Sequence, residues 1–528
     1  MSRELTPPPR ACIILSTLNA KYIHASLGLR YLLANMARHG GEDLRACSLL
    51  REFTIARPPQ EIAAALLAEL PAGEGRQIIG FGVYIWNLAQ TTAVVRLLKA
   101  ARPTLKIVLG GPELSHEWQQ QEIVQLADHL ITGWGDVSFP KLCRALIHGP
   151  QPLQKVIAGE QPPLDEIELP YAEFSAEDLA HRLLYVEASR GCPFKCEFCL
   201  SALDKTAWAF DLDFFLGELD RLYARGARHF KFVDRTFNLK IEASLRVLQF
   251  FLERLDEGLF LHFELVPDHL PERLKAMIAR FPPGVLQFEI GIQSFNPEVQ
   301  QTISRRQDTA RTLANLQWLL QESHAHLHTD LIFGLPGESL ESFAAGFDQL
   351  YAIGPHEIQL GVLKRLRGTP IARHTAAFGM LYEETPPYTV LQTAAVDAAT
   401  MQRFKRLARY WDLLANSGRF KRAMAMLCQG PSAFGAFLAF ADWLWQWHPD
   451  TAGKTSGLRP EVLLDALFDY FTTQRGEERE HVRQLLRADY LDSGARSNPR
   501  CLSGLLGDRA APQPMATKRL RQARHVAD

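Results

Sequence analysis

The sequence of 528 residues has no long hydrophobic run. No stretch approaches the roughly 18 to 20 consecutive apolar residues that a helix needs to cross a bilayer. The N-terminus, MSRELTPPPR, also lacks the apolar core of a secretory signal. These absences predict a cytoplasmic protein that does not contact a membrane.

Charge of one sign is not in excess either. The chain has 58 basic and 59 acidic residues, a net charge of -1, so nucleic acid is not indicated as a partner. Hydrophobic residues make up 47% and charged residues 22% of the chain, which excludes a disordered, collagenous or fibrous protein. At roughly 150 residues per domain, the length predicts about three or four domains.

Cysteine is scarce. Eight cysteines in a chain of this length exclude a scaffold held together by disulfides. We expect the scattered ones to be small buried apolar residues or unreactive thiols: Cys12, Cys47, Cys143, Cys428 and Cys501. The other three stand together and carry most of the functional information.

Residues 11–150 alternate short apolar runs with helical patterns. Buried strands are predicted at 11–15 (ACIIL), 78–85 (IIGFGVYI) and 106–111 (KIVLGG), with a helical stripe around Val94 and Leu98 between the last two. This alternation favours a doubly wound α/β domain with a parallel sheet.

Residues 172–400 repeat the alternation. Six strands are predicted, at 183–189, 229–234, 260–266, 285–292, 326–334 and 357–363. Helical stripes lie between them, one of which ends at Gly226. Six βα units in about 200 residues favour a partial (β/α)6 barrel like that of triosephosphate isomerase, with an open doubly wound sheet as the alternative.

The remaining segments show weaker patterns. Residues 1–10 form a proline-rich lead-in, and residues 151–171 form a proline-rich linker. Residues 401–505 form a mostly helical C-terminal domain without a sharp catalytic motif. Residues 506–528 are polar and basic and are expected to form a disordered tail.

The three remaining cysteines follow the first predicted barrel strand. The segment SRGCPFKCEFC places Cys192, Cys196 and Cys199 in a C-x3-C-x2-C spacing, in a loop where barrel folds build active sites. Such closely spaced thiolates select zinc or an iron–sulfur cluster. Structural zinc sites take four ligands, usually as two separated pairs, and no second Cys or Cys/His pair stands at zinc-finger spacing, which weighs against zinc. A [4Fe–4S] cluster also usually takes four thiolates, so three leave one iron open for a substrate or cosubstrate.

This spacing resembles that of the radical S-adenosylmethionine (SAM) superfamily. Four further segments resemble those of superfamily members with an N-terminal cobalamin-type domain: FVDRTFN, ELVPD, EIGIQSFNP and DLIFGLPGES. The resemblance implies that the three cysteines hold a [4Fe–4S] cluster whose open iron is chelated by SAM. It further implies reductive cleavage of SAM to methionine and a 5′-deoxyadenosyl radical, with the electron coming from a donor such as flavodoxin or ferredoxin.

The resemblance also suggests residues that contact SAM. It implies a ribose contact for Glu289, a carboxylate contact for Arg305 or Arg306, and an adenine contact for the turn at Gly334. Carboxylates recur on the predicted strands, where they either face a wet cavity or cap strand ends and pair with arginine: Glu187, Asp234, Glu264, Glu289 and Asp330. A solvated helix face is the alternative for the two arginines. The Gly-Gly-Glu segment that often binds the SAM amino group is replaced here by VDRTFN.

The N-terminal domain resembles a cobalamin (B12)-binding domain in TLNAKYIHASLGLRYL, FGVYIWN, VLGGPE and TGWGD. Gly110 and Gly111 end a predicted strand, where a flat cofactor can approach the backbone closely. The Asp-x-His-x-x-Gly signature that supplies a lower cobalt ligand is absent. His24 lies in the corresponding loop without the upstream aspartate, and a surface or packing role is the favoured interpretation.

With its helical C-terminal region, the chain resembles one subfamily of B12-binding-domain radical SAM proteins whose C-terminal domain has no known function. We expect an enzyme that uses cobalamin for methyl transfer to, or rearrangement of, an unidentified substrate. The alternatives are a radical SAM enzyme with a relic N-terminal domain and a non-catalytic iron–sulfur sensor. No catalytic residue beyond the cofactor ligands is predicted.

Overall fold

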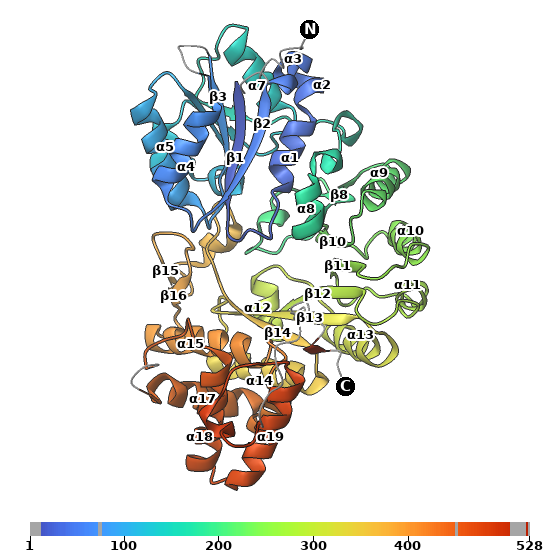
Figure 1. The fold of residues 1–528 in the computed structure, drawn as a ribbon, viewed down its shortest axis with the longest axis vertical. Coiled ribbons are helices and arrows are strands. Elements are labelled where there is room, and N and C mark those ends of the chain that lie inside the picture. Colours follow the sequence, from blue (N-terminus) through green and yellow to red (C-terminus); the bar gives the residue numbers. More distant parts are fainter. Residues whose placement is uncertain (1–11, 72–75, 449–451, 507–523, 526–528) are drawn as a thin grey trace, which may run out of the picture.

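The computed structural model describes residues 12–71, 76–448, 452–506 and 524–525. In chain order, two parallel α/β units are followed by a helical region (Figure 1). The α/β fold class and the helical C-terminal region are therefore confirmed. The predicted lead-in, residues 1–10, and most of the predicted tail, residues 506–528, lie outside the described residues.

The first sheet has the strand order β2-β1-β3-β4-β5-β6, and every neighbouring pair is parallel. The chain order reverses between β1 and β3, which is where open α/β sheets leave a crevice for ligands. The strands are β1 (Ile13–Asn19), β2 (Ser48–Thr54), β3 (Ile78–Gly82), β4 (Lys106–Gly110), β5 (His129–Thr132) and β6 (Val156–Ala158).

Helices cover both faces of this sheet, as a doubly wound domain requires. Ile62, Val94 and Leu98 pack on one face, and Leu29 and Leu142 pack on the other. The helices are α1 (Leu27–Ala34), α2 (Met36–Gly40), α3 (Glu42–Ala46), α4 (Pro59–Glu69), α5 (Leu88–Ala101), α6 (Glu122–Leu126) and α7 (Ser138–Ile147). Because β1 is buried on both faces, its sequence reads as an apolar run.

The first sheet extends further than the sequence indicated. Strands β1, β3 and β4 match the predicted ones, whereas β2, β5 and β6 were not predicted. The short strand β6 lies inside the segment predicted as a linker and pairs with β5 through Leu130 and Val156. The first unit therefore continues to residue 158.

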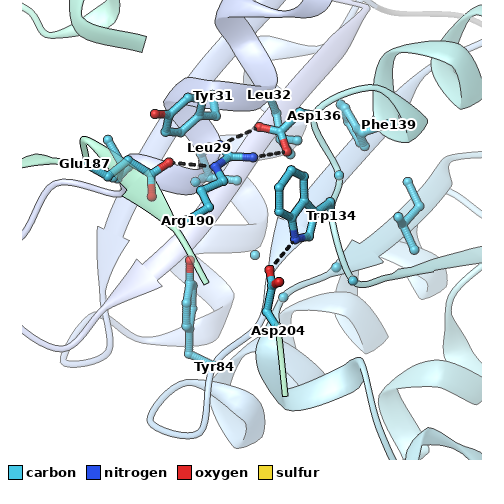
Figure 2. Close-up of a pocket in the computed structure, with 18 of the residues that line it drawn as sticks. Leu29, Tyr31, Leu32, Tyr84, Trp134, Asp136, Phe139, Glu187, Arg190 and Asp204 are labelled. Atoms are coloured by element: carbon cyan, nitrogen blue, oxygen red, sulfur yellow. Dashed lines mark hydrogen bonds and ion pairs between the residues drawn. The ribbon is translucent and has the colours of Figure 1, made fainter. Parts of the chain in front are cut away.

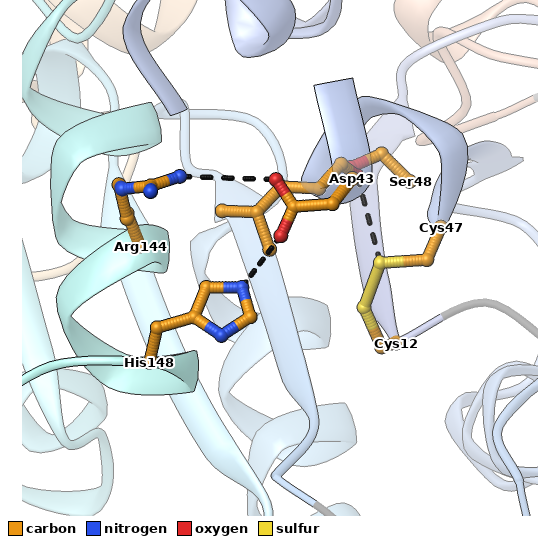
Figure 3. The surroundings of a disulfide bond; sticks show 7 residues. Cys12, Asp43, Cys47, Ser48, Arg144 and His148 are labelled. Atoms are coloured by element: carbon orange, nitrogen blue, oxygen red, sulfur yellow. Dashed lines mark hydrogen bonds and ion pairs between the residues drawn. A yellow bond between two sulfur atoms is a disulfide. The ribbon is translucent and has the colours of Figure 1, made fainter. Parts of the chain in front are cut away.

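Cys12 and Cys47 correct the expectation that all scattered cysteines are unreactive thiols. The two are joined by a disulfide of 2.06 Å (Figure 3). The pairing follows from topology, because the two residues directly precede the neighbouring parallel strands β1 and β2. Asp43 lies nearby and accepts a 2.6 Å hydrogen bond from His148.

The second sheet contains six parallel strands in the order β14-β13-β12-β11-β10-β7. All six predicted strands are present: β7 (Leu184–Val186), β10 (His229–Phe232), β11 (Phe260–Leu265), β12 (Leu286–Gln293), β13 (His326–Phe333) and β14 (Glu357–Val362). Among the described residues, β7 and β14 are the two edges of this sheet, so the barrel is partial.

Helices line the outer face of this partial barrel (Figure 1). They are α9 (Leu212–Ala224), α10 (Ile241–Leu252), α11 (Glu272–Ile278), α13 (Thr309–Glu322) and α14 (Leu340–Ile353). The short helix α12 (Pro297–Thr302) follows β12 and lies beside the cysteine loop. The short helix α8 (Ala176–His181) precedes β7. As predicted, Gly226 terminates α9: it follows the C-cap residue Arg225 and has a φ of 101°. On β12, Phe288 and Ile290 are buried in the core, whereas Glu289 on the opposite face is only partly buried. The inner face of the barrel is therefore polar.

The C-terminal region packs against the last part of the barrel. Phe404 of α15 stacks on Phe333 of β13 with ring centroids 4.1 Å apart. The helices are α15 (Ala398–Leu414), α16 (Lys421–Leu427), α17 (Ala433–Gln446), α18 (Pro460–Thr473) and α19 (Arg479–Asp492), and a small hairpin of β15 (Leu381–Tyr382) and β16 (Val390–Gln392) precedes them. None of the helices in the described part of the chain has the length and apolar character of a membrane span.

Candidate active site

A cavity of about 240 Å³ lies at the carboxyl ends of the second sheet, beside the loop that carries the clustered cysteines. It brings together most of the residues that the sequence suggested: Cys192, Cys196, Cys199, Glu264, Glu289, Arg305, Arg306 and Asp330. Phe194 and Phe198 of the same loop also line it. We call this cavity the cysteine cavity.

The cysteine loop is closed at its base by a short antiparallel pair, β8 (Ser189–Arg190) with β9 (Trp208–Ala209). Gly191 has a φ of 82°, and a Cβ there would lie 2.7 Å from the backbone nitrogen of Ala207. Only glycine fits this turn without a shift of the backbone. The next residue, Cys192, donates its N–H to the carbonyl of Asp204 at 3.0 Å. The loop therefore leaves the sheet in a defined direction.

The thiols of the loop sit in a partly buried setting. Burial raises the pKa of Cys192 and of Cys196. The guanidinium of Arg305, with its Nη1 at 3.6 Å from the Cys196 Sγ, opposes this rise. Across the described residues, no three His, Cys, Asp or Glu side chains converge on a point that could hold one metal ion. In an iron–sulfur cluster each thiolate binds its own iron, so the ligands need not converge. Three soft donors around one cavity therefore suit a cluster better than a single ion.

Glu289 is held in its ionised form at the rim of the cysteine cavity. It accepts hydrogen bonds from His262 at 2.9 Å and from Lys231 at 3.2 Å. Burial works to raise the pKa of Glu289, but these two partners outweigh burial and hold the pKa well below its usual range. An ionised carboxylate can accept hydrogen bonds from the hydroxyl groups of a ligand.

A second charged group extends along the inner face of the barrel. His328 lies between Asp330, at 3.2 Å, and Glu357, at 3.4 Å. Burial alone would lower the pKa of His328, but its bonds to both carboxylates raise the pKa to about 10. Burial raises the pKa of Asp330 itself. Glu289 and Asp330 thus face a polar interior rather than the apolar core.

A larger cavity, of about 460 Å³, lies at the carboxyl ends of the first sheet and reaches the second (Figure 2). We call it the interdomain cavity. Glycines keep the strand ends open on its wall: Gly80 and Gly82 of β3, Gly110 of β4, and Gly111, Gly133 and Gly135 of the following loops. Gly110 and Gly111, which were predicted as cofactor-binding residues, are both part of the lining.

Arg190, two residues before Cys192, joins the two units at this cavity. Its guanidinium forms two hydrogen bonds with Asp136, at 2.8 and 3.0 Å, and one with Glu187 at 2.8 Å (Figure 2). The guanidinium carbon also lies 4.4 Å from the ring centroid of Tyr31 and 4.8 Å from that of Trp134. The β5–α7 loop of the first unit is thereby fixed against the start of the cysteine loop.

Arg235 connects the two cavities. Among the residues that the structure describes, it is the one that lines both the interdomain and the cysteine cavity. It forms a 2.5 Å ion pair with Glu264 of β11, and the charge of that carboxylate helps to raise the pKa of Arg235 despite burial. A ligand in one cavity therefore lies within reach of the same side chain as a ligand in the other.

Some predicted residues lie elsewhere. His24 bonds to the hydroxyl of Tyr185 at 2.7 Å and is not part of the lining of either cavity. A Cβ on Gly334 would lie 2.6 Å from Val390, so this turn faces the C-terminal region rather than the cysteine cavity. Asp234 accepts from the N–H of Ala188 and from Ser189, and burial raises its pKa to about 7.

Several residues of the two cavities were not predicted. Asp136 stands in the segment TGWGD, whose resemblance to a B12-binding domain assigned no role to the aspartate. Arg190 precedes Gly191, and Arg235 replaces the expected Gly-Gly-Glu segment. No local pattern marks these residues, because their partners lie far away in the sequence.

Three families match successive parts of the chain. Residues 14–143 match the B12 binding domain, residues 186–350 the Radical SAM superfamily, and residues 376–516 a protein family of unknown function, DUF4080.

Two curated methyltransferases resemble this chain over more than half of its length, at 22% sequence identity. The 2-(S-pantetheinyl)-carbapenam-3-carboxylate methyltransferase of Streptantibioticus cattleyicolor is 22% identical over 454 residues, 74% of this chain and 63% of that protein. The cobalamin-dependent radical SAM methyltransferase TokK of Streptomyces tokunonensis is 22% identical over 354 residues, 58% of this chain and 49% of that protein. The matched region thus spans less than two thirds of either relative.

Solved structures share the fold. TsrM from Kitasatospora setae, a radical SAM methyltransferase with tryptophan and a SAM analogue bound, superposes with a TM-score of 0.56 at 15% identity, over 72% of this chain and 80% of that one. The cobalamin-dependent radical SAM enzyme OxsB, with aqua-cobalamin bound, gives a TM-score of 0.58 at 12% identity, over 91% and 84% of the two chains. At these identities the comparison establishes a common architecture.

Proposed function

Because the chain belongs to the radical SAM proteins that carry a B12-binding domain before the barrel and a DUF4080 domain after it, we propose that it is a cobalamin-dependent radical SAM enzyme. Methyl transfer is the proposed reaction class, since the relatives named above are methyltransferases. The observation that carries the proposal is that the cysteine cavity and the interdomain cavity adjoin and share Arg235.

We assign Cys192, Cys196 and Cys199 as the ligands of a [4Fe–4S] cluster. When bound, the cluster supplies the electron that cleaves SAM reductively to methionine and a 5′-deoxyadenosyl radical. The three thiols line one cavity, and Arg305 lies close enough to Cys196 to stabilise its thiolate. An electron donor such as flavodoxin or ferredoxin is required by this chemistry.

Residues of the cysteine cavity suit the binding of SAM. Glu289 keeps its negative charge and can accept hydrogen bonds from ribose hydroxyls. Arg306 lines the same cavity and provides a cation for the SAM carboxylate. Arg305, the other predicted candidate, already donates to the carbonyl of Gly291 and to Cys196, so we favour Arg306 for this contact.

The interdomain cavity suits cobalamin. Glycine-rich strand ends at this cavity let a large flat ligand approach the backbone closely. When bound there, cobalamin supplies a transferable methyl group. His24 points to Tyr185 instead of this cavity, so we propose that no histidine of this loop binds the lower face of the cobalt.

Iron and absorption measurements test the cluster. Anaerobically reconstituted wild type should contain roughly four irons per chain. Cys196→Ala should lose them, whereas Cys428→Ala should retain them, because Cys428 is buried in the C-terminal core. Full iron content in the Cys196 variant would refute the ligand assignment.

A separate binding experiment tests cobalamin. The protein is mixed with hydroxocobalamin, desalted and examined by its absorption spectrum. A leucine at Gly110 would extend into the interdomain cavity, where the nearest atom to a Cβ is 3.7 Å away. Gly110→Leu should therefore lose cobalamin but keep its iron, and His24→Ala should keep both. Cobalamin that does not remain on the wild type would show that the N-terminal domain is a relic.

A further inference from the structure

One residue of the cysteine loop turns away from the cysteine cavity. Glu197 directly follows Cys196, yet it is absent from the lining of that cavity and only 2% exposed. A buried carboxylate is costly unless partners compensate its charge. We therefore ask which residues compensate the buried charge of Glu197.

The partners of Glu197 come from two distant segments. Its Oε1 accepts from Ser304 at 2.6 Å and from Arg373, and its Oε2 accepts from His374 at 2.7 Å. Ser304 follows α12, whereas Arg373 and His374 lie in the 3-10 helix Pro370–His374 that follows the last barrel strand. His374 is well buried and Arg373 is mostly exposed, so we expect His374 to be the stronger partner.

The backbone of Glu197 is held by the same two segments. Its N–H donates to the carbonyl of Ile303 at 3.0 Å, and its carbonyl accepts from the N–H of Ile371 at 3.0 Å. Ile303 and Ile371 are both fully buried. Both the side chain and the backbone of one residue in the cysteine loop are thus fixed by residues more than 100 positions later in the chain.

The second of these segments leads into the C-terminal domain. Residues 376–516 form the DUF4080 match, which begins directly after His374 and Thr375. The ring of Phe378 lies 5.7 Å from that of His374, and the backbone of Phe378 pairs with Ala394 before α15 begins. The C-terminal domain is therefore joined to the cysteine loop through one short helix.

We propose that Glu197 is a positioning residue that sets the geometry of the cysteine loop and links it to the C-terminal domain through His374 and Arg373. The proposal rests on the assignment of the cluster to this loop. Glu197 acts through its neighbours Cys196 and Cys199, since it does not itself line the cavity. Through Glu197, the segment at the start of the C-terminal domain helps to hold the cysteine loop in place.

The main test replaces the carboxylate with an amide of the same shape. Glu197→Gln should still fold and bind iron. We expect its reduced cluster to differ from wild type in its electron paramagnetic resonance spectrum and reduction potential, because loop geometry and hydrogen bonding set both. SAM affinity should fall about ten-fold, as when an outer partner of a metal site is lost. Glu197→Asp should recover part of this loss.

Two further variants locate the effect. His374→Gln should show a smaller change of the same kind, and the double variant should be no worse than Glu197→Gln alone, since both remove one interaction. Glu113→Gln is the matched control. Glu113 is also buried and pairs with Arg367, which precedes the 3-10 helix Pro370–His374, but Glu113 lies on the first unit. Its cluster spectrum and potential should match those of wild type.

Hydrogen exchange of the iron-free protein tests the role of Glu197 independently of the proposed cluster. In iron-free protein, hydrogen exchange of residues 192–199 should be faster in Glu197→Gln and His374→Gln than in wild type. Faster exchange in a protein that never binds iron would refute the cluster assignment but leave the link intact. Unchanged exchange, together with an unchanged spectrum and SAM affinity, would overturn the link.

Discussion

Individual polar residues on the inner face of the barrel owe their ionisation to their neighbours. Glu289 and Asp330 are both carboxylates on adjacent strands, but the pKa of Glu289 is lowered by His262 and Lys231, whereas burial raises that of Asp330. From the sequence alone, both residues would be expected to have the ordinary pKa of a carboxyl group. The difference comes from side chains on other strands, which a linear pattern does not identify.

Glu289 yields a prediction about cofactor affinity. Glu289→Gln removes the negative charge but keeps the size of the side chain. Loss of a hydrogen bond to a charged group should weaken SAM binding by about 1.5 to 3 kcal/mol, roughly 10- to 150-fold. Equilibrium binding of SAM to the reconstituted protein measures this change. Glu298→Gln, at an exposed position on α12, is the control, and equal affinities of the two variants would contradict the ribose assignment.

His328 yields a prediction about stability and pH. Its pKa in the folded protein is raised to about 10, because Asp330 and Glu357 outweigh burial. The protonated histidine therefore stabilises the fold fully below its ordinary pKa of 6.5, and this contribution is lost as pH rises through about 10. His328→Gln lacks the contribution, so the difference in melting temperature between wild type and variant should be largest near pH 6 and should shrink toward pH 10. A constant difference over this range would refute the charged state.

At the scale of elements, the turn after β13 shows how a glycine allows two parts of the chain to pack closely. Gly334 has a φ of 83°, and Val390 and Met401 of the C-terminal region fill the space where its side chain would stand. The adenine contact that the sequence suggested for this turn stays a prediction. The conformation of Gly334 also allows the end of a barrel strand to meet α15.

Two glycines with nearly the same backbone conformation test this interpretation. Gly334→Ala should destabilise the protein through both a strained φ and a clash with Val390. Gly284→Ala, with a φ of 85° and no atom within 4 Å of a Cβ, should show the backbone cost alone, about 1 to 2 kcal/mol. Chemical denaturation measures both free energies of unfolding. A Gly334 variant no less stable than the Gly284 variant would show that the packing against Val390 adds nothing.

The sequence predicted the strands and the motif that are marked by residues close together in the chain. Strands β1, β3 and β12 carry runs of buried residues, and the clustered cysteines form a motif within eight positions. The strands β2 and β6 were missed because each is an edge of its sheet and only partly buried, which removes the continuous apolar run. Arg190 and Glu197 were missed because their partners lie far along the chain.

At the scale of the whole molecule, the first unit contacts both later parts. Arg190 fixes the β5–α7 loop to the barrel through Asp136. Glu113 of the loop after β4 accepts from Tyr388 at 2.6 Å and pairs with Arg367 at 3.1 Å. Polar contacts of the first unit therefore reach both the barrel and the C-terminal region.

The Arg190 ion pair gives the last prediction. Asp136→Asn removes one of the two carboxylate charges that face the guanidinium, in surroundings where it is only 12% exposed, and keeps one of the two acceptor oxygens. A hydrogen-bonded buried charge that loses one partner should cost about 1 to 3 kcal/mol. We expect faster hydrogen exchange in residues 133–138 and 188–191, and weaker binding of cobalamin to the interdomain cavity. Asp43→Asn is the control, because this mostly exposed carboxylate pairs with His148 on the first unit and does not reach the barrel (Figure 3). If both variants bind cobalamin as wild type does, the position of the first unit against the barrel does not depend on Arg190.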